Sequence, residues 1–247
     1  MNRIATDTLG AVRATAEDYV FSWLDGDRGR MDGCLHPDLA KRALADPTGG
    51  RLDLVEMSKD QLVERATAPK PYGRGVQIDV QAVDDDIASA SVRSEPFLDL
   101  LHLARFGERW LIVNALWAPM PIEPATPEAT VGVSRALQDY AVFPFERDVE
   151  RARRCHHPHL RERRAVTPGA SDLALEETTL EEVLAIAGSG FDEEPSSRGA
   201  TTDILNLTAS YASARMDVAW FQIHLHLASF ADGWRIVNIL YRTKGDG

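Results

Sequence analysis

The sequence predicts an α+β protein made of two tandem domains, each with helices on one face of an antiparallel sheet. Three observations lead to this prediction. The sequence repeats itself, so the chain contains two copies of one unit. In each copy, segments with helical periodicity come first and pairs of strands follow. A segment with four prolines, 119–127, lies between the copies and is typical of a stiff linker.

The repeat follows two nearly constant offsets. His36-Pro37 returns as His157-Pro158, an offset of 121 residues (157 − 36), and His102 returns as His226, an offset of 124 (226 − 102). The other matched pairs include Tyr19 with Tyr140, Cys34 with Cys155, Phe97 with Phe221, Trp110 with Trp234 and Asn114 with Asn238. We therefore predict domains at 1–120 and 126–247, each long enough to fold independently.

Composition and charge exclude several classes of protein. The formal net charge is −11, from 38 acidic and 27 basic residues, whereas a nucleic-acid-binding surface would need a basic face. The chain has no long apolar run, and its first residues lack the apolar core of a signal peptide. We expect a cytoplasmic protein without nucleic-acid or membrane partners. Cys34 and Cys155 are expected to be reduced thiols, because a disulfide would require the two positions to meet at the axis relating the copies.

A long helix is predicted at the start of each copy. Apolar residues recur at three- and four-residue spacings from Leu9 to Trp23, and Asp25-Gly26-Asp27 ends the first helix. In the second copy, Thr126-Pro127-Glu128 is a typical helix start. Pro144 stands at the position of Trp23, so the second long helix is expected to kink or stop early.

Two shorter helices are predicted in each copy. The first ends at the His-Pro pair, because proline disfavours helical geometry in the preceding residue. His36 and His157 are therefore expected at a helix exit. The second begins near Ser58 or Thr179, and Thr179 with Glu182 forms the pattern of a capping box.

Hairpin strands complete each copy. Alternating or continuous apolar runs separated by short polar turns, such as Asp84-Asp85-Asp86, indicate them. The predicted strands are 76–82, 87–92, 97–106 and 110–117 in the first copy, and 204–207, 211–216, 221–230 and 234–241 in the second. The second copy also has a longer acidic loop, 189–199, which we expect to be mobile.

Several spaced motifs together resemble the putative lumazine-binding family. They are Tyr19, the run His36-Pro37-Asp38-Leu39-Ala40-Lys41-Arg42, the segment 87–90, and the segments 99–103 and 110–114. The resemblance covers nearly the whole chain, once per copy. That family belongs to the nuclear transport factor 2-like (NTF2-like, SnoaL-like or cystatin-like) superfamily, whose members include isomerases, hydrolases, cyclases, dehydratases and non-catalytic binding modules.

The resemblance implies a cone in each copy, in which a strongly curved sheet wraps around helices and encloses a pocket. It also implies that such domains pair through their sheets. The closing strands agree, because Leu98 and Leu100 lie on one face and Leu101 and Leu103 on the other, so both faces need an apolar cover. We therefore expect a monomer in which the two copies form an intramolecular pseudo-dimer.

Histidines on the closing strands are the first group of candidate site residues. His102, His224 and His226 share one face with Gln222, because side chains two apart on a strand point the same way. One interpretation makes them bases in the pocket, or metal ligands with His157 as a third donor. The other makes them polar residues satisfied by hydrogen bonds between sheets. We expect no bound metal, because no cysteine or carboxylate joins the pattern.

His36 and Asp99 are the second group. As an acid–base pair in the first copy, both would have pKa values moved toward neutrality by burial, as proton transfer requires. In the structural alternative, His36 caps a helix or bonds a backbone carbonyl, and Asp99 bonds Tyr19 or His36. The second copy keeps the His-Pro pair but has Ile223 in place of Asp99, which favours a structural role for the histidine.

The full set of predicted site residues combines these groups with buried amides and aromatic residues. Asn114 and Asn238 interrupt apolar strands, and a buried amide needs polar partners. Trp220 is the best candidate for a pocket wall. The predicted catalytic residues are His36, Asp99 and His102; the predicted ligand-binding residues are Tyr19, Trp110, Asn114, Tyr140, His157, Trp220, Gln222, His224, His226 and Asn238.

The sequence contains no phosphate loop, dinucleotide-binding glycine pattern, nucleophile elbow or zinc motif, so we expect no dedicated cofactor. We predict a small-molecule-binding protein, accessory to a biosynthetic pathway, with a ligand in one or both cones. A cofactor-independent isomerase, cyclase or hydrolase acting on an apolar or aromatic metabolite is the alternative prediction. A metal-dependent form using His224 and His226 is the third.

Overall fold

The computed structural model describes residues 3–46, 52–166, 174–190 and 199–244. The chain divides into two compact units whose main boundary lies between Ile122 and Glu123. We call them domain 1 and domain 2. Within the described ranges, each domain contains a six-stranded sheet and three helices.

The two domains contain the same elements in the same order. Domain 1 consists of α1 (Arg3–Asp25), α2 (Arg28–Cys34), β1 (Leu35–Ala45), β2 (Asp53–Met57), α3 (Lys59–Arg65), β3 (Gln77–Asp84), β4 (Ile87–Arg93), β5 (Phe97–Phe106) and β6 (Arg109–Pro119). Domain 2 consists of α4 (Pro127–Glu146), α5 (Val149–Cys155), β7 (His156–Val166), β8 (Ala174–Thr178), α6 (Leu180–Ser189), β9 (Thr201–Leu207), β10 (Tyr211–Asp217), β11 (Phe221–Phe230) and β12 (Gly233–Thr243).

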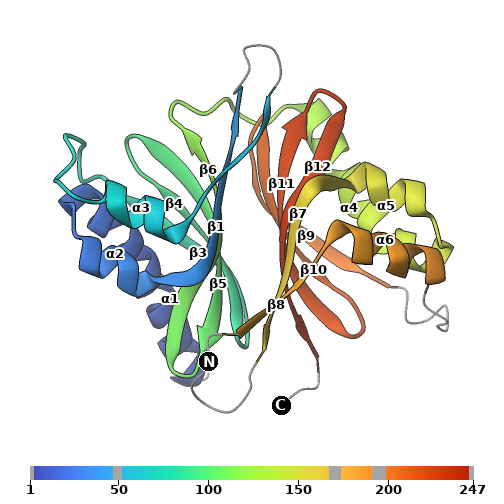
Figure 1. Ribbon diagram of the computed structural model, residues 1–247, viewed down its shortest axis with the longest axis horizontal. Helices are drawn as coiled ribbons and strands as arrows, with labels where there is room; N and C mark the ends of the chain where they lie inside the picture. The colour runs from blue at the N-terminus through green and yellow to red at the C-terminus, as the bar shows by residue number, and fades with distance from the viewer. Residues whose placement is uncertain (1–2, 47–51, 167–173, 191–198, 245–247) are drawn as a thin grey trace. The chain divides into compact units, whose positions relative to one another are not determined.

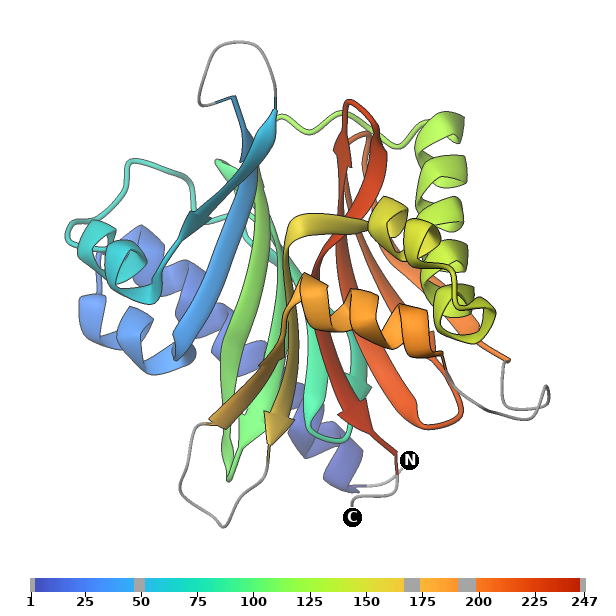
Figure 2. The same cartoon turned by 45° about the vertical axis from the view of Figure 1, so that its right-hand side comes forward.

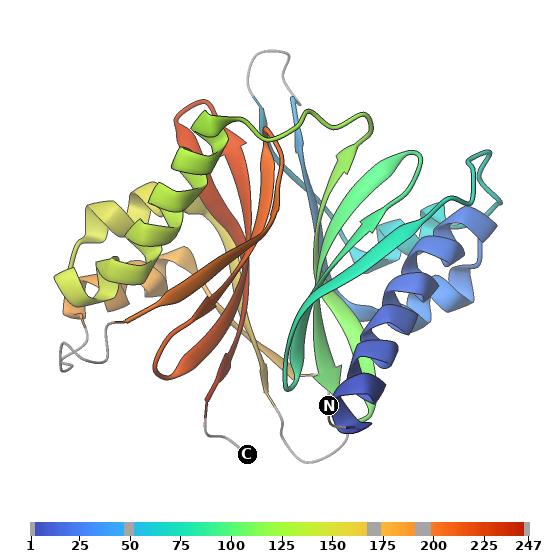
Figure 3. The same ribbon diagram turned by 180° about the vertical axis from the view of Figure 1, so that it is seen from behind.

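Each sheet combines an antiparallel meander with one parallel strand. The strand order is β2-β1-β6-β5-β4-β3 in domain 1 and β8-β7-β12-β11-β10-β9 in domain 2. Strands β3 to β6 pair antiparallel, whereas β1 pairs parallel with β6. In each domain the three helices lie on one face of the curved sheet (Figure 1). Seen from behind, the long helix of each domain, α1 or α4, runs across this face of its own sheet (Figure 3).

Local capping sets where the helices begin. Ser58 and Thr179 start α3 and α6 with complete capping boxes, in which Gln61 and Glu182 bond back to the cap. Thr126 caps α4, and its side chain accepts a hydrogen bond from Ala129 N. The predicted helix starts at Thr126, Ser58 and Thr179 are therefore confirmed.

The sequence did not predict β1, β2, β7 or β8, and it placed His36 and His157 at a helix exit. In the structure α2 ends at Cys34, and His36 lies inside β1. The strand register shifts between Leu35 and Ala40, so Pro37 sits at an irregularity where no ladder hydrogen bond is needed. This irregularity breaks the alternation by which a strand is recognised in a sequence.

Pro144 does not end its helix early. Helix α4 continues to Glu146, the position equivalent to Asp25 at the end of α1. Proline removes a hydrogen bond to the residue four positions back, which weakens only the last turn when the helix ends two residues later. The predicted loop at 189–199 falls mostly on residues 191–198, which lie outside the described residues.

The core of each domain lies between the helices and one face of the sheet. In domain 1, Leu101 and Leu103 of β5 pack there against Val12 and Ala16 of α1. In domain 2, Leu225 and Leu227 take the places of the two leucines. Leu98 and Leu100 belong to the other face of β5 because neighbouring strand residues alternate. Pairing of that face with the sister sheet remains a prediction.

Both cysteines are free and buried. Cys34 and Cys155 end the short second helices, and each thiol lies near the backbone oxygen three residues earlier. Burial raises the pKa of Cys34 to about 12 and raises that of Cys155 as well. In the part of the chain that the structure describes, no helix is long and apolar enough to cross a bilayer.

His156 gives domain 2 a pH-dependent core position. It stands where domain 1 has Leu35, and its ring lies 5.5 Å from both Tyr140 and Phe143. Nδ1 lies 2.8 Å from the carbonyl oxygen of Ala152, which fits a neutral imidazole that donates there. Burial lowers the pKa of His156 to about 4. The stability contributed by the neutral ring is therefore full above about pH 6.5 and is lost as the pH falls toward 4.

We expect His156→Leu to remove this loss. Relative to the wild type, the variant should gain about 2–3 kcal/mol in the unfolding of domain 2 at pH 4.5 and little at pH 8. Thermal unfolding at both pH values measures the difference. His159→Leu provides the control, because it removes an exposed histidine of the same strand that is not part of the core. A gain of the same size at pH 8 and pH 4.5 would contradict the prediction.

Candidate functional site

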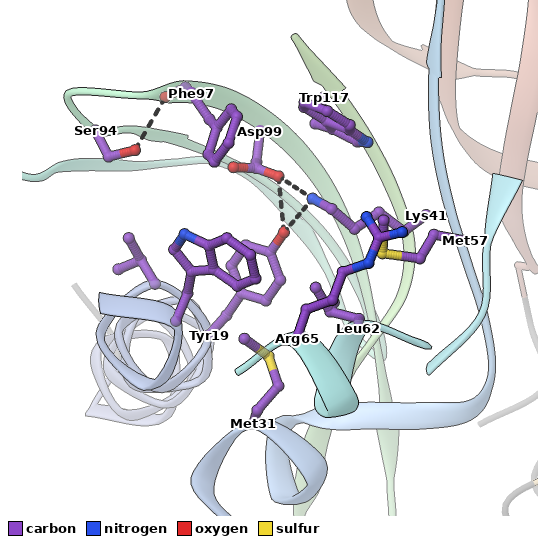
Figure 4. A pocket seen from close by; sticks show the side chains of 12 residues that line it. Tyr19, Met31, Lys41, Met57, Leu62, Arg65, Ser94, Phe97, Asp99 and Trp117 are labelled. Atoms are coloured by element: carbon purple, nitrogen blue, oxygen red, sulfur yellow. Dashed lines mark hydrogen bonds and ion pairs between the residues drawn. The ribbon is translucent and has the colours of Figure 1, made fainter. Parts of the chain in front are cut away.

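Each domain holds a pocket between its helices and the inner face of its sheet. The domain 1 pocket has a volume of about 90 Å³ (Figure 4). Side chains from α1, α2, α3, four strands and the turn between β4 and β5 line it: Tyr19, Val20, Trp23, Met31, Lys41, Met57, Leu62, Arg65, Ser94, Phe97, Asp99 and Trp117. The pocket is therefore aromatic and aliphatic, with a few polar groups at fixed points.

A buried polar triad, Tyr19–Lys41–Asp99, is part of the lining of the domain 1 pocket. Lys41 Nζ donates to Asp99 Oδ1 at 2.5 Å and to Tyr19 Oη at 2.5 Å, and Tyr19 Oη donates to the same carboxylate oxygen at 2.7 Å. Figure 4 shows the three side chains converging from α1, β1 and β5. Lys41 is only 7% exposed and Asp99 only 4%. The two charges thus neutralise each other inside the domain.

Burial and the Asp99 charge oppose each other at Lys41 and act together at Tyr19. Burial lowers the pKa of Lys41, and the Asp99 carboxylate opposes this by stabilising the ammonium. Burial raises the pKa of Tyr19, and the neighbouring Asp99 charge raises it further. Tyr19 is therefore a neutral donor, while Lys41 and Asp99 form an ion pair.

Aromatic rings enclose the ammonium. Lys41 Nζ lies 5.2 Å from the ring centroid of Tyr19 and 5.2 Å from that of Trp117. Phe97 packs edge-to-face on Trp117, with centroids 5.1 Å apart, and on Trp23 at 6.3 Å. These distances fit cation–π and aromatic contacts, so the rings form an aromatic cage that the Lys41 ammonium already occupies.

The domain 2 pocket occupies the equivalent place and is larger, at about 170 Å³. The lining residues come from α4, α6, strands of the β7–β12 sheet and the turn between β10 and β11: Tyr140, Ala141, Phe143, Pro144, Phe145, Glu162, Thr178, Val183, Ile186, Met216, Val218, Trp220, Phe221, Ile223 and Tyr241. Helices α4 and α6 lie over this part of the sheet (Figure 2). A cavity of about 150 Å³ can hold benzene, so this pocket has room for a ring.

The two pockets differ in their charged groups. At an offset of 121, Glu162 of β7 stands where Lys41 stands in β1, and at an offset of 124, Ile223 replaces Asp99. Tyr140 matches Tyr19, and Tyr241 matches Trp117. The ion pair of domain 1 is thus replaced by a single carboxyl group in domain 2.

Glu162 lacks the partner that its counterpart has. The residue is half-buried, with its Oε2 atom inside and without a hydrogen-bond partner among the described residues. Burial raises the pKa of Glu162 to about 7. Burial also raises the pKa values of Tyr140 and Tyr241, and the charge of Glu162 adds to both shifts. Both phenols therefore lie near the carboxyl group and stay neutral.

The structure brings four of the predicted site residues into the pockets. Tyr19 and Asp99 lie together in domain 1, and Tyr140 and Trp220 lie in domain 2. Asp99 bonds Tyr19 and Lys41, not His36, so the hypothetical His36–Asp99 acid–base pair does not form.

Both histidines of the His-Pro pairs have local structural contacts. His36 Nδ1 accepts a hydrogen bond from Asp38 N at 3.0 Å, and its ring lies 4.9 Å from Phe106. His157 repeats this arrangement with His159 N at 3.1 Å and Phe230 at 4.7 Å. Neither ring lines the domain 1 or domain 2 pocket, which agrees with the structural alternative.

The remaining predicted residues lie outside the pockets. His102 is close to Asn114 (3.4 Å) and His226 to Asn238 (3.2 Å), pairs that join neighbouring strands on the face opposite the helices. His224 and Gln222 share that face, because residues two apart on β11 point the same way. Trp110 packs in the domain 1 core. The alternation was read correctly, but it does not say which face of the strand meets the helices.

No metal centre emerges from these histidines. Within the described ranges, no group of three or more His, Cys, Asp or Glu side chains is arranged to hold a metal ion. The predicted third donor, His157, stacks on Phe230 at the His-Pro pair of β7, whereas His224 and His226 lie on β11.

Lys41 and Glu162 were missed by the sequence predictions. Both lie in strands that were not predicted, so their direction into a pocket could not be read. A signal was nevertheless present in the sequence. The offset of 121 aligns Lys41 with Glu162, so the charge at this position of the repeat is positive in the first copy and negative in the second. Combined with Asp99 and Ile223, it indicates that the copies diverged in one polar cluster.

The comparison with protein families agrees with this geometry. The family described as "Putative lumazine-binding" matches residues 7–118 and, a second time, residues 128–242. The chain belongs to this family. The twofold match and the two six-stranded sheets confirm the prediction of an α+β protein made of two tandem copies of one unit. Among curated proteins, none matches this chain.

Several solved structures each match about one domain of the chain. An NTF2-like protein of unknown function from Silicibacter pomeroyi DSS-3 is 21% identical, with 48% of this chain and 99% of that one covered and a TM-score of 0.41. An NTF2-like protein from Methylobacillus flagellatus KT is 20% identical, with 47% of this chain and 94% of that one covered and a TM-score of 0.38. A ketosteroid isomerase-like protein from Erwinia carotovora atroseptica SCRI1043 is 15% identical, with 46% of this chain and 96% of that one covered and a TM-score of 0.33.

Proposed function

We propose that this protein binds small, largely apolar ligands in the pockets of its two domains, with a ring compound in the larger pocket of domain 2. One observation carries the proposal: the same place in both domains holds a pocket built from equivalent side chains, while the polar groups inside have diverged. A structural core would have no need to keep the space open in both copies, because closely packed cores are more stable. Divergence of the polar group is expected if the two pockets take different ligands.

The walls support a flat ligand. Phe221 of domain 2 packs edge-to-face on Tyr241 with centroids 5.6 Å apart, and Trp220 and Phe143 also line the pocket. Each offset or edge-to-face ring contact is worth about 0.5–1.5 kcal/mol beyond the area it buries. The name of the family points to lumazine, a fused heteroaromatic ring, and a ligand of that kind is part of the proposal.

Binding is tested by titration calorimetry with lumazine and 2-naphthol. We expect at least one probe to bind with a Kd in the micromolar range. Thr178→Phe and Met57→Phe form a matched pair, because both residues are half-buried at equivalent places on the pocket walls. Each should weaken binding in its own domain at least tenfold. Absence of heat with both probes, or binding unaffected by either variant, would overturn the proposal.

A cofactor-independent enzyme is a second candidate function, and one observation favours it. A carboxyl group with a pKa of about 7, such as Glu162, is suited to general acid–base catalysis at neutral pH. This group differs from the His36 and Asp99 of the sequence prediction. Turnover of a bound ring compound that stops in Glu162→Gln, with the fold intact, would establish this function.

We also propose that the chain is a cytoplasmic monomer, accessory to a biosynthetic pathway, whose two sheets pair internally. Two free, buried thiols, Cys34 and Cys155, support a reducing compartment. Closing strands that are apolar on both faces support the pairing. Sedimentation should give a single species of 27.3 kDa at all concentrations. A dimer that forms as the concentration rises would contradict the monomer.

A further inference from the structure

We propose that the domain 2 pocket is a binding site for an aromatic or other apolar-ring compound that carries one protonated amine, with the ammonium group paired to Glu162. The inference rests on the proposed function, since it assumes that the pocket takes a ring. It adds the charge of the ligand and the residue that recognises it. Domain 1, whose equivalent position carries its own ammonium, is not expected to share this preference.

The carboxyl group of Glu162 faces an otherwise uncharged pocket. Among the described lining residues it is the one ionisable side chain apart from the phenols of Tyr140 on α4 and Tyr241 on β12. The lining residues from α6, β10 and β11 are apolar or aromatic, and β8 contributes Thr178. A carboxylate inside such a pocket is poorly solvated, so a cation that reaches it gains a strong interaction.

The basic residues next to Glu162 in β7 are paired elsewhere. Arg161 and Arg163 both bond to Glu177 of β8, with Arg163 Nε at 3.0 Å from Glu177 Oε2. Arg164 bonds to Glu176 at 2.6 Å. These pairs account for the nearby positive charges outside the pocket. The pocket itself retains a negative charge when Glu162 is ionised.

Domain 1 shows what an ammonium group needs at this place. Lys41 Nζ sits 5.2 Å from two ring centroids, those of Tyr19 and Trp117, and 2.5 Å from the carboxylate of Asp99. In domain 2 the equivalent rings are those of Tyr140 and Tyr241. A carboxyl group is also present, but it belongs to Glu162 of β7 and not to β11, the strand equivalent to β5. Domain 2 lacks only the ammonium. A ligand amine would complete the same combination of cage, cation and carboxylate.

The proposal predicts a pH dependence of binding with a definite sign. The titratable groups that face Glu162 are Tyr140 from α4 and Tyr241 from β12, and both stay neutral. Glu162 must lose its proton to pair with an ammonium, and its pKa in the free protein is about 7. Affinity for an amine should therefore rise about tenfold between pH 6 and pH 8, whereas affinity for a neutral isostere should not change.

The probes for the test are 2-(aminomethyl)naphthalene and its neutral isostere 2-(hydroxymethyl)naphthalene, titrated calorimetrically into the full chain. At pH 8 the amine should bind at least tenfold more tightly than the alcohol. Glu162→Gln should reduce this advantage at least tenfold, abolish the pH dependence and leave the affinity for the alcohol within about twofold. Glu181→Gln, an exposed position in the first turn of α6 and outside the pocket, is the control and should behave as the wild type.

The outcomes separate this inference from the proposed function. If neither naphthalene derivative binds, the inference is overturned, and the result with lumazine and 2-naphthol decides the proposed function. If both bind equally, or if Glu162→Gln keeps the preference for the amine, the pocket takes rings but the inference is overturned. Loss of amine binding in Thr178→Phe, but not in Met57→Phe, is expected from a domain 2 site, and the reverse result would also overturn it. Glu162→Ala serves as a second variant, and circular dichroism verifies that each variant is folded.

Discussion

Lys41→Met is expected to lower the free energy of unfolding of domain 1 by about 3–5 kcal/mol, because it leaves Asp99 as an unpaired buried charge. The carboxylate is 4% exposed and would keep only the hydrogen bond from Tyr19. Urea unfolding monitored by tryptophan fluorescence measures the loss. An exposed ion pair supplies the control: Arg30→Met removes a 2.6 Å contact with Asp18 and should cost no more than about 1 kcal/mol.

Removing both charges should restore most of the stability. In Lys41→Met combined with Asp99→Ile, the second change introduces the residue that domain 2 has at the equivalent position, Ile223. We expect the double variant to be at least about 2 kcal/mol more stable than Lys41→Met alone, a coupling typical of groups in direct contact. A double variant with the summed losses of its single variants would show that the triad is not an interacting unit.

Glu162→Gln is expected to stabilise domain 2 by about 2–3 kcal/mol at pH 8 and to have little effect at pH 4. The folded pKa of Glu162, about 7, lies above the ordinary value of 4.5. Between these values the folded state keeps a proton that the unfolded state has lost. The stability contributed by Glu162 is thus full below about pH 4.5 and is lost as the pH rises through 7. Differential scanning calorimetry across this range measures the gain.

His156 and Glu162 give domain 2 opposite pH slopes. The neutral His156 destabilises the fold as the pH falls below 6.5, whereas Glu162 destabilises it as the pH rises from 4.5 to 7. The free energy of unfolding of the wild type should therefore change little between pH 4.5 and about 6.5. His156→Leu should reveal the pH dependence caused by Glu162, and Glu162→Gln that caused by His156. Glu181→Gln, at an exposed position in the first turn of α6, is the control. An unchanged profile in Glu162→Gln would mean that its carboxyl group is solvated in the folded state.

Several site residues could be predicted because they lie in elements with strong local signals. Tyr19 and Tyr140 belong to long amphipathic helices, and Asp99 and Trp220 to the segments around well-marked closing strands. The repeat adds a second reading of each position. The replacement of Asp99 by Ile223 in the second copy was visible in the sequence. It is one of the two changes of charge that distinguish the pockets.

The second change of charge, from Lys41 to Glu162, lies on strands that the sequence did not reveal. Strands β1 and β7 begin with a His-Pro pair, contain a register shift and pair parallel with β6 and β12. Parallel pairing joins residues far apart in the chain, and the shift disturbs the alternation, so neither leaves a local pattern. For this reason Lys41 and Glu162 were absent from the predicted site.

The sequence by itself determined the duplication, the α+β class, the helix starts and the closing hairpins, because repeats, caps and periodicity are properties of neighbouring residues. Only the tertiary structure decided which face of β5 and β11 meets the helices. That choice placed Asp99 in a pocket and His102, His224 and His226 on the opposite face. Alternation states which residues share a face, whereas the packing of helices on the sheet decides what that face contacts.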